Sequence, residues 1–516
     1  MKKISLLFIA IFATTTIFAQ QLLNIENVQK AYLKGAGSIN ENKAVKGYYV
    51  FYESDKIDRK TREYTIQILD ENGNAVKKTT FQDSKDVILF DAEFNGKSIC
   101  FFFANTDKKK YVFKIFDLNG KMTQEYEKEY DNGDYALFLA YANGFTNKDE
   151  DATTNTLISI PNLGFVSLLP VRQGGSNIFE IGYYSSEKNN SYVYRPEFEE
   201  RQTNATCMAV VDSTIYLAVN KKKSLLGGKL MATCYAFNPV VQKKVFELEQ
   251  KFDGKTKSIP AFFTKDEASG NLIMAATYYD EEDDIAKDYG LGIAVYTLQK
   301  NGSVINANYN SWQKDFAKYL PLNDKGKLES TGFLSIQDIQ KTQDGKLIIA
   351  AEGYKRKFDG LGTFMKLAGG SGNFTKVVIT DLVMIELDAD YKVKKATIYP
   401  KKEFTGFAHP AADYYSQHTI ALLLKSIGSF DYAFTSKSKD NSSISFCYYD
   451  WEKTDNYKGG TFNAIKYSNN KFTTDKIQLN SKAKYLSVLP AKQGYVGIYE
   501  YNKKEKKITF RLEKLN

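Results

Sequence analysis

Apolar and polar residues alternate in two short runs across residues 62–81 (REYTIQILDENGNAVKKTTF), and Asn72-Gly73 lies between the runs. Alternation with a period of two is typical of a strand with one buried face, and Asn-Gly between two such runs is a strong hairpin signal. The same design returns at residues 111–126, 292–305 and 382–398, and more loosely at 463–477. The sequence therefore predicts similar β-hairpins spread along the whole chain.

A strongly apolar run precedes each hairpin, such as GYYVFYES before the first and KLIIAAEGY before the fourth. These runs indicate strands that are buried on both faces. Units of about four antiparallel strands, repeated every ~40–50 residues or more, are typical of a β-propeller. We predict an all-β fold, a β-propeller of seven or eight four-stranded blades whose last blade is shared by both ends of the chain. Tandem β-sandwiches are the alternative, because short alternating strands serve both folds.

The first 19 residues have the layout of a secretory signal peptide. Lys2 and Lys3 precede the apolar run ISLLFIAIF, and Ile17-Phe18-Ala19 leads into two glutamines. The run is too short to span a bilayer, which needs about 20 apolar residues. We expect cleavage after Ala19 and an exported protein, located in the periplasm or outside the cell. Residues 20–516 then form a single propeller-like domain.

Two segments carry apolar residues at helical spacing instead of alternating. They are residues 311–320 (SWQKDFAKYL) and 410–427 (PAADYYSQHTIALLLKSI). A serine can cap the first, Pro321 stops it, and Gly428 follows the second. We predict two short helices that decorate the ring.

Residues 355–380 form a glycine-rich insertion between two strand runs. Connections longer than ~12–15 residues are uncommon in compact domains and are often functional. We expect this insertion to fold over the mouth of the propeller channel, as a lid or a partner-docking element. Its apolar surface would include Phe358, Leu361, Phe364 and Met365. A disordered surface insertion is the alternative, because glycine richness fits that reading as well.

Charge and cysteine content add little to the prediction of partners and of disulfides. The formal net charge is +9 and comes mostly from lysine, whereas specific phosphate recognition tends to use arginine. We interpret the lysines as solvated surface and expect no nucleic-acid partner. There are four cysteines without a C-x-x-C pair, and Cys100, Cys234 and Cys447 lie in apolar runs. Four buried thiols are therefore expected, with a Cys207–Cys234 disulfide as the alternative.

Candidate residues for catalysis are few. His409 and His418 do not have the i, i+4 spacing of a helical metal pair, and no nucleophile-elbow or phosphate-loop motif occurs. Glu352 and Asp381 flank the insertion and are weak candidates for acid–base chemistry. Two carboxylates alone identify no reaction, because their separation decides the mechanism. The sequence therefore assigns no catalytic residue, no cofactor and no metal ligand.

Several stretches carry a family resemblance. They are QDGKLIIAAEGYKRKF, VVITDLVMIELDADYKVKKATIYPK, FDYAFTSKSKDNSSISFCYYD and the closing VLPAKQGYVGIYEYNKKEKKITFRLEKLN. The chain resembles a family of uncharacterised secreted proteins of Bacteroidota, strongly in the carboxyl half and loosely in the amino half. The resemblance implies source and compartment, and it brings no assigned activity or site residues.

Two functional hypotheses follow. The first is a non-enzymatic exported binding protein of the bacterial envelope, whose partner is a protein, a peptide or a glycan. The second is a hydrolase or lyase whose acid and base are carboxylates in the propeller channel. Fold alone does not separate them. The second requires convergent acidic, basic or tyrosine side chains in one concave pocket.

The signal layout predicts that the exported protein starts at Gln20. Amino-terminal sequencing of protein secreted from an expressing cell should return QQLLN. Recovery of an intact Met1 on exported protein would contradict the assignment.

Overall fold

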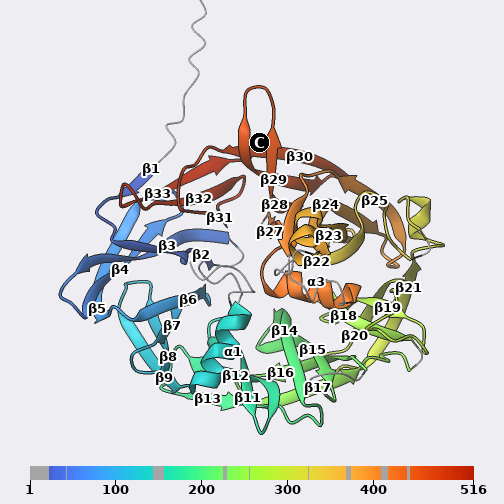
Figure 1. Ribbon diagram of the computed structural model, residues 1–516, viewed down its shortest axis with the longest axis horizontal. Coiled ribbons are helices and arrows are strands. Elements are labelled where there is room, and N and C mark those ends of the chain that lie inside the picture. Colours follow the sequence, from blue (N-terminus) through green and yellow to red (C-terminus); the bar gives the residue numbers. More distant parts are fainter. Residues whose placement is uncertain are drawn as a thin grey trace, which may run out of the picture.

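The computed structural model of the protein is a closed ring of β-sheets (Figure 1). It describes residues 22–41, 44–142, 156–224, 229–254, 256–323, 325–367, 374–407, 416–438 and 442–515. Over these residues the strands form eight blades, which confirms the predicted β-propeller and decides between seven and eight blades. The predicted signal peptide, residues 1–19, lies outside the described residues.

Each blade is an antiparallel array of strands that follow chain order from the axis outward, except that the amino-terminal strand is the outermost strand of blade 8. Blades 3 and 4 belong to one continuous sheet. Blade 1 is β2 (Lys30–Glu41), β3 (Ala44–Lys56), β4 (Thr61–Asp70) and β5 (Ala75–Ser84). Blade 2 is β6 (Val87–Phe94), β7 (Ser98–Asn105), β8 (Lys110–Asp117) and β9 (Met122–Glu129). Blade 3 is β10 (Leu157–Ile160), β11 (Gly164–Gln173), β12 (Ser176–Ser185) and β13 (Ser191–Tyr194). Blade 4 is β14 (Gln202–Val211), β15 (Thr214–Lys222), β16 (Met231–Asn238) and β17 (Lys243–Glu249).

The second half of the ring repeats the plan. Blade 5 is β18 (Lys257–Lys265), β19 (Leu272–Tyr279), β20 (Gly292–Leu298) and β21 (Val304–Ser311). Blade 6 is β22 (Phe333–Lys341), β23 (Leu347–Phe358), β24 (Thr375–Leu387) and β25 (Val393–Tyr399), with the short β26 (Phe404–Phe407) added on β24. Blade 7 is β27 (Tyr432–Lys437), β28 (Ser443–Lys453), β29 (Lys458–Ser468) and β30 (Lys471–Leu479). Blade 8 is β31 (Tyr485–Pro490), β32 (Tyr495–Asn502), β33 (Lys507–Lys514) and β1 (Leu22–Ile25).

The helices differ from the prediction. Of the expected helix at 311–320, only a 3₁₀ turn (Phe316–Lys318) forms, because Ser311 still belongs to strand β21 and pairs with Gly292. The second is α3 (Gln417–Ser426), which is shorter than predicted, and residues 408–415 lie outside the described part. The prediction missed α1 (Asn132–Ala142) between blades 2 and 3, and α2 (Gly360–Leu367) inside the insertion.

Three of the outer hairpins share a turn built on an aspartate. In the first, the Asp70 carboxylate accepts hydrogen bonds from the backbone N–H groups of Asn72 (2.9 Å) and Asn74 (2.8 Å). Gly73 follows with φ +84°, a conformation that glycine adopts without steric cost. Asp117 and Asp388 make the same pair of bonds in blades 2 and 6. An aspartate that fixes its own turn in this way explains why the hairpin signal recurs in the sequence.

Large side chains, mainly aromatic, fill the gaps between neighbouring blades. Phe113 of blade 2 stacks on Tyr184 of blade 3 with ring centroids 3.8 Å apart. Phe51 and Phe101 join blades 1 and 2, and Tyr216 and Phe263 join blades 4 and 5. A blade is a sheet with two apolar faces, so it needs a neighbour on each side. The many Tyr and Phe residues of the sequence therefore supply side chains that pack between the blades.

The ring is closed by the amino-terminal strand. β1 pairs with β33 along its full length, from Leu22↔Arg511 to Ile25↔Ile508, and so completes blade 8. The backbone N–H of Val28 donates to the carbonyl of Lys506 (2.8 Å) just beyond this strand. The prediction that both ends share the last blade is confirmed.

All four cysteines are free thiols. Cys100, Cys234 and Cys447 are buried, and Cys207 is half-buried. Burial raises the pKa of the Cys207 and Cys447 thiols to about 12. The expected packing role is confirmed for three of them, and the alternative Cys207–Cys234 disulfide is absent.

Phe510 at the seam between blades 8 and 1 should be critical for stability. Its ring lies 4.6 Å from that of Tyr48, and only 1% of the residue is exposed. Phe510→Ala would leave a cavity at the closure and should lower the free energy of unfolding by about 3–5 kcal/mol, measured by urea unfolding. Val76→Ala, on an exposed outer strand, is the control and should change it by less than about 0.5 kcal/mol. Equal effects of the two substitutions would contradict the role of the seam.

Candidate functional site

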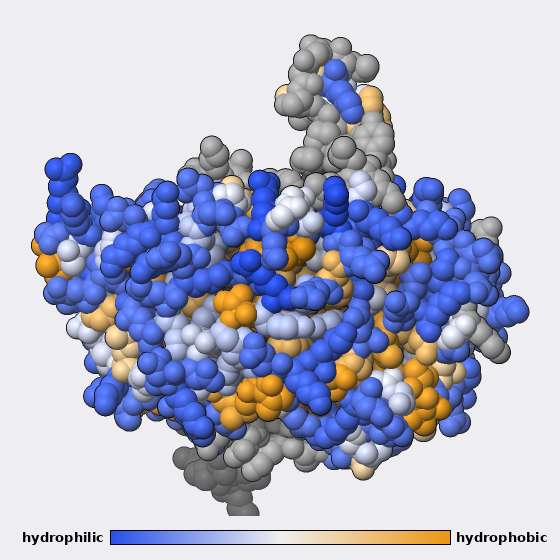
Figure 2. Space-filling model, turned by 90° about the horizontal axis from the view of Figure 1, so that it is seen from below, coloured by the Kyte–Doolittle hydropathy of each residue, from blue (hydrophilic) through white to orange (hydrophobic). Residues whose placement is uncertain are grey.

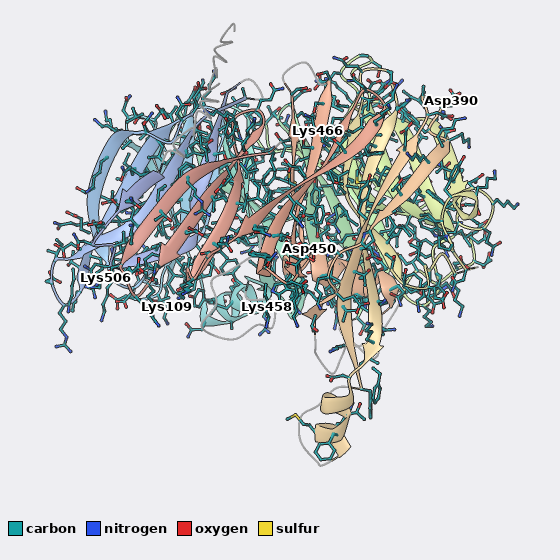
Figure 3. The ribbon with its side chains drawn as sticks, turned by 90° about the horizontal axis from the view of Figure 1, so that it is seen from above. Lys109, Asp390, Asp450, Lys458, Lys466 and Lys506 are labelled. Atoms are coloured by element: carbon teal, nitrogen blue, oxygen red, sulfur yellow. The ribbon has the colours of Figure 1, made fainter. Side chains whose placement is uncertain are left out.

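One face of the ring carries most of the structure that lies outside the regular blades. Figure 3 shows helix α1 and the insertion between β23 and β24 on the same face. The insertion is a two-stranded extension of blade 6, paired from Lys355↔Val378 to Phe358↔Thr375, with α2 at its end. We call residues 355–380 the arm. It stands out from the ring and does not lie across it, so the expectation that it folds over the channel mouth is wrong (Figures 2 and 3).

The predicted apolar residues of the arm lie largely in solvent. The exposed fraction is 72% for Phe358, 69% for Phe364 and 46% for Met365. Phe374, which the prediction did not single out, is 41% exposed. The side chain of Leu361 lies outside the described part of the structure. The arm therefore presents a group of large apolar side chains, which the sequence had led us to expect on a buried surface.

Helix α3 supports the base of the arm. The Ser416 side chain caps it by accepting from the N–H of Thr419 (3.1 Å), and Gly428 ends it with φ +61°. Ile420, Leu424 and Ile427 form one cluster with Tyr354, Val377 and Ile379 at the base of β23 and β24. The Tyr354 hydroxyl also donates to the carbonyl of Gln417 (3.1 Å). The apolar face that predicted this helix is thus the face that fixes the arm.

Figure 1 shows α3 beside the first strands of blades 4, 5 and 6. Between the other side of α3 and these strands lies a cavity of about 110 Å³. His418 lines it, and its Nε2 lies 3.3 Å from the amide oxygen of Asn220. Burial lowers the pKa of His418 to about 4, so the ring is neutral near pH 7. Lys425 donates to the carbonyls of Ile336 (3.2 Å) and Ala261 (3.4 Å), and burial lowers its pKa to about 8. His418 and Lys425 thus contact amide and carbonyl oxygens of the protein itself, as buried polar groups usually do in a folded interior. His409 lies outside the described residues.

Glu352 and Asp381, the two weak candidates, are brought together around Lys401. The Glu352 carboxylate lies 2.7 Å from the Lys401 ammonium and accepts from the N–H groups of Asp431 and Tyr432, each at 3.1 Å. Asp381 accepts from the Thr331 hydroxyl (2.6 Å) and from the Lys401 N–H (3.3 Å). The Lys401 ammonium also pairs with Asp431. Sequence reasoning missed Lys401 and Asp431, because nothing marks one lysine among many.

The centre of this network is sealed from solvent, whereas Asp381 is half-buried and the Asp431 side chain is 19% exposed. The side chains of Glu352 and Lys401 are both 0% exposed. Burial raises the pKa of Glu352 to about 7, against the opposing effect of Lys401. Both Glu352 oxygens accept hydrogen bonds, and the network joins blade 6 to the first strand of blade 7. The arrangement holds two blades together, and the fully buried Glu352 carboxylate has no exposed surface that a substrate could reach.

A second pair of carboxylates lies on β6, the innermost strand of blade 2. Asp91 accepts from the N–H groups of Thr156 (2.9 Å) and Leu157 (3.0 Å), and its other oxygen lies 4.0 Å from the Lys34 ammonium. Glu93 follows two residues later and is half-buried. Burial, with Asp91 adding to it, raises the pKa of Glu93 to about 8. Sequence reasoning overlooked this pair. Two acidic residues within the first strand of a blade were the feature that could have indicated it.

The described residues were also compared with what a metal site and a membrane-spanning helix require. In the described ranges, no three His, Cys, Asp or Glu side chains are grouped so that they could hold a metal ion. No helix among those described is long and apolar enough to cross a membrane.

The whole chain, residues 1–516, matches a family of unknown function, DUF6770. The chain belongs to that family. A search of curated proteins found no match. The solved structures that are similar include Sqt1 of Saccharomyces cerevisiae, with 9% identity, coverage of 96% of this chain and 98% of that one, and a TM-score of 0.43.

Two other solved structures are similar at the same level of identity. The WD40 domain of SCAP from fission yeast has 9% identity, coverage of 95% and 94%, and a TM-score of 0.38. A post-proline cleaving enzyme from Rickettsia typhi has 9% identity, coverage of 90% of this chain and 58% of that one, and a TM-score of 0.40.

The sealed network predicts a pH effect on stability. The pKa of Glu352 is about 7 in the folded protein and about 4.5 when unperturbed, so the folded state retains a proton that the unfolded state loses between these values. Stability therefore falls as pH rises from 4.5 to 7, by at most about 1.4 kcal/mol per pH unit. Glu352→Gln cannot ionise, so the stability of the wild type minus that of the variant should decline across this window in urea unfolding. Glu505→Gln, at an exposed position, is the control; a flat difference for Glu352→Gln would contradict the prediction.

Proposed function

We propose that this protein is a non-catalytic binding protein of the bacterial envelope and that the arm is its docking element. The observation that carries the proposal is the exposure of Phe358, Phe364, Met365 and Phe374 on one projecting hairpin. Exposed apolar side chains gathered at one place mark interaction sites. Export rests on the signal-like amino terminus, and a bacterial source rests on the family resemblance.

The base of the arm is built for a fixed geometry. Lys355 lies 2.8 Å from the carboxylate of Glu403, and Lys357 pairs with its other oxygen. β26, which follows Glu403, adds a third strand beside β24, with Ile379↔Phe404 in register. Together with α3, these contacts hold the base while the end remains in solvent. A rigid element loses little conformational entropy when it binds, which favours a docking role.

The candidate acid–base groups named from the sequence fit a structural role better than a catalytic one. Glu352 is paired with the Lys401 ammonium in the interior, and Asp381 accepts from the Thr331 hydroxyl and the Lys401 backbone N–H, whereas a general base needs reach to a substrate proton. The hydrogen bonds and ion pairs of these residues therefore position blade 7 against blade 6.

A carboxylate-dependent hydrolase or lyase with its site in the propeller channel is the second candidate function. The pair on β6 favours it, because burial and the neighbouring Asp91 raise the pKa of Glu93 to about 8, and a carboxyl group that keeps its proton near pH 7 can act as a general acid. Hydrolysis of ester, peptide or glycoside probes that is lost in Glu93→Gln, with unchanged folding, would support this alternative over the binding role.

Removal of the end of the arm tests the proposed function. A chain that lacks residues 361–372 should keep its thermal unfolding midpoint, because the described apolar side chains there face solvent. Its association with the envelope fraction of the producing cell, measured by co-sedimentation, should fall by about tenfold or more, the loss of at least ~1.4 kcal/mol of binding. Undiminished association of the shortened chain would exclude the arm as the docking element.

A further inference from the structure

The end of the arm combines apolar side chains with positive charge. From residue 355 to residue 376 the sequence has five basic residues and one acidic residue, Asp359. The basic residues are Lys355, Arg356, Lys357, Lys366 and Lys376. Lys355 and Lys357 pair with Glu403 at the base, so the positive charge that the arm adds beyond this pair comes from Arg356, Lys366 and Lys376. The Lys366 ammonium lies 3.9 Å from the centre of the Phe374 ring, so charge and apolar surface are in direct contact. Asp359 is used within the arm, where its carboxylate accepts from the N–H of Gly362 (3.1 Å) at the start of α2.

The size of the apolar surface bears on the kind of partner. Phe358, Phe364, Met365 and Phe374 are 72%, 69%, 46% and 41% exposed. At about 200 Å² for each side chain, they offer roughly 450 Å². A stable protein–protein interface buries about 800 Å² on each partner, of which a little over half is apolar. The exposed apolar area of the arm is therefore enough for a protein or for a lipid surface, and the charge beside it decides between them.

From the positive charge beside exposed apolar side chains at the end of a projecting hairpin, we infer that the partner of the arm is an anionic lipid surface. The inference rests on the proposed docking role of the arm and names its partner. Phe and Met side chains enter the boundary between headgroups and acyl chains, while Lys and Arg remain among the phosphates. Such insertion reaches only about 5–10 Å into the boundary and needs no membrane-spanning helix.

The orientation of the arm fits this partner. Figure 3 shows the hairpin extending from the face of the ring, with α2 at the far end. The end of the arm can therefore reach a flat surface before the blades do. The contacts of Glu403 with Lys355 and Lys357, and the packing of α3, hold the direction of the hairpin. Each positive charge close to an anionic surface adds attraction that salt screens.

Co-sedimentation of the purified full chain with lipid vesicles tests the inference. Vesicles of equal parts phosphatidylglycerol and phosphatidylcholine should carry the protein down at 0.1 M NaCl, and vesicles of phosphatidylcholine alone should carry about tenfold less. The double variant F364S/M365S should lose binding by about tenfold or more, and K366Q/K376Q should lose the preference for phosphatidylglycerol. The control V76S/V241S changes two equally exposed apolar residues (66% and 65%) away from the arm and should bind as the wild type does.

The outcomes separate the two proposals. If the wild type ignores both vesicles while its association with the envelope fraction still depends on residues 361–372, the arm docks a protein or glycan, and the lipid inference is wrong. If V76S/V241S loses binding as strongly as F364S/M365S, adsorption is general to the surface, and the inference is wrong as well. Failure of the arm deletion to reduce envelope association overturns the proposed function itself.

Discussion

The pairing of β1 with β33 is the constraint on which the rest of the structure depends. A blade has two apolar faces, so an open row of eight blades would expose one face at each end. The ring removes both ends, because blade 8 packs on blade 1 through Phe510 and Tyr48 and takes its outermost strand from the amino terminus. Contacts between residues almost 500 positions apart close the ring, and the entropic cost of joining so long a loop grows only slowly with its length. The closed ring then supplies a rigid base for everything on its face.

The buried ionic network and helix α3 extend this rigidity into the less regular part of the chain. Blade 7 begins at Tyr432, directly after a long connection, and Glu352 grips the backbone N–H groups of Asp431 and Tyr432 at that point. Lys401 balances the charge, and without it the carboxylate of Asp431 would face the buried carboxylate of Glu352. α3 lies in the same connection and packs on the base of the arm. Glu352, which the sequence offered as a candidate for catalysis, is therefore part of the structure that fixes the direction of the arm.

Sequence reasoning reached the fold because the relevant signals are local. The Asp70-to-Asn74 turn and its copies are set by hydrogen bonds within five residues, so the hairpins and the repeat could be counted. The predicted helix at 311–320 was wrong because Ser311 is bound by blade 5, a contact that no local pattern reports. α1 was missed because its sequence, NGDYALFLAYA, is apolar almost throughout and lacks a clear one-sided stripe. The partners of Glu352 lie 49 to 80 residues away, so their convergence depends on the packing of blades and not on any motif.

The arm shows most clearly what composition can and cannot decide. Its length, glycines and apolar residues indicated an element with a function, and those features are as consistent with a lid as with a projection. The difference depends on whether Phe358 and Phe364 find a surface within the protein. Among the described residues, α3 packs on the base of the hairpin, while Phe358 and Phe364 remain largely exposed. Apolar side chains left in water cost solubility. On a surface otherwise rich in lysine, they are best explained by a partner that covers them. The positive charge around them then selects among partners, because it repels basic surfaces and attracts anionic ones.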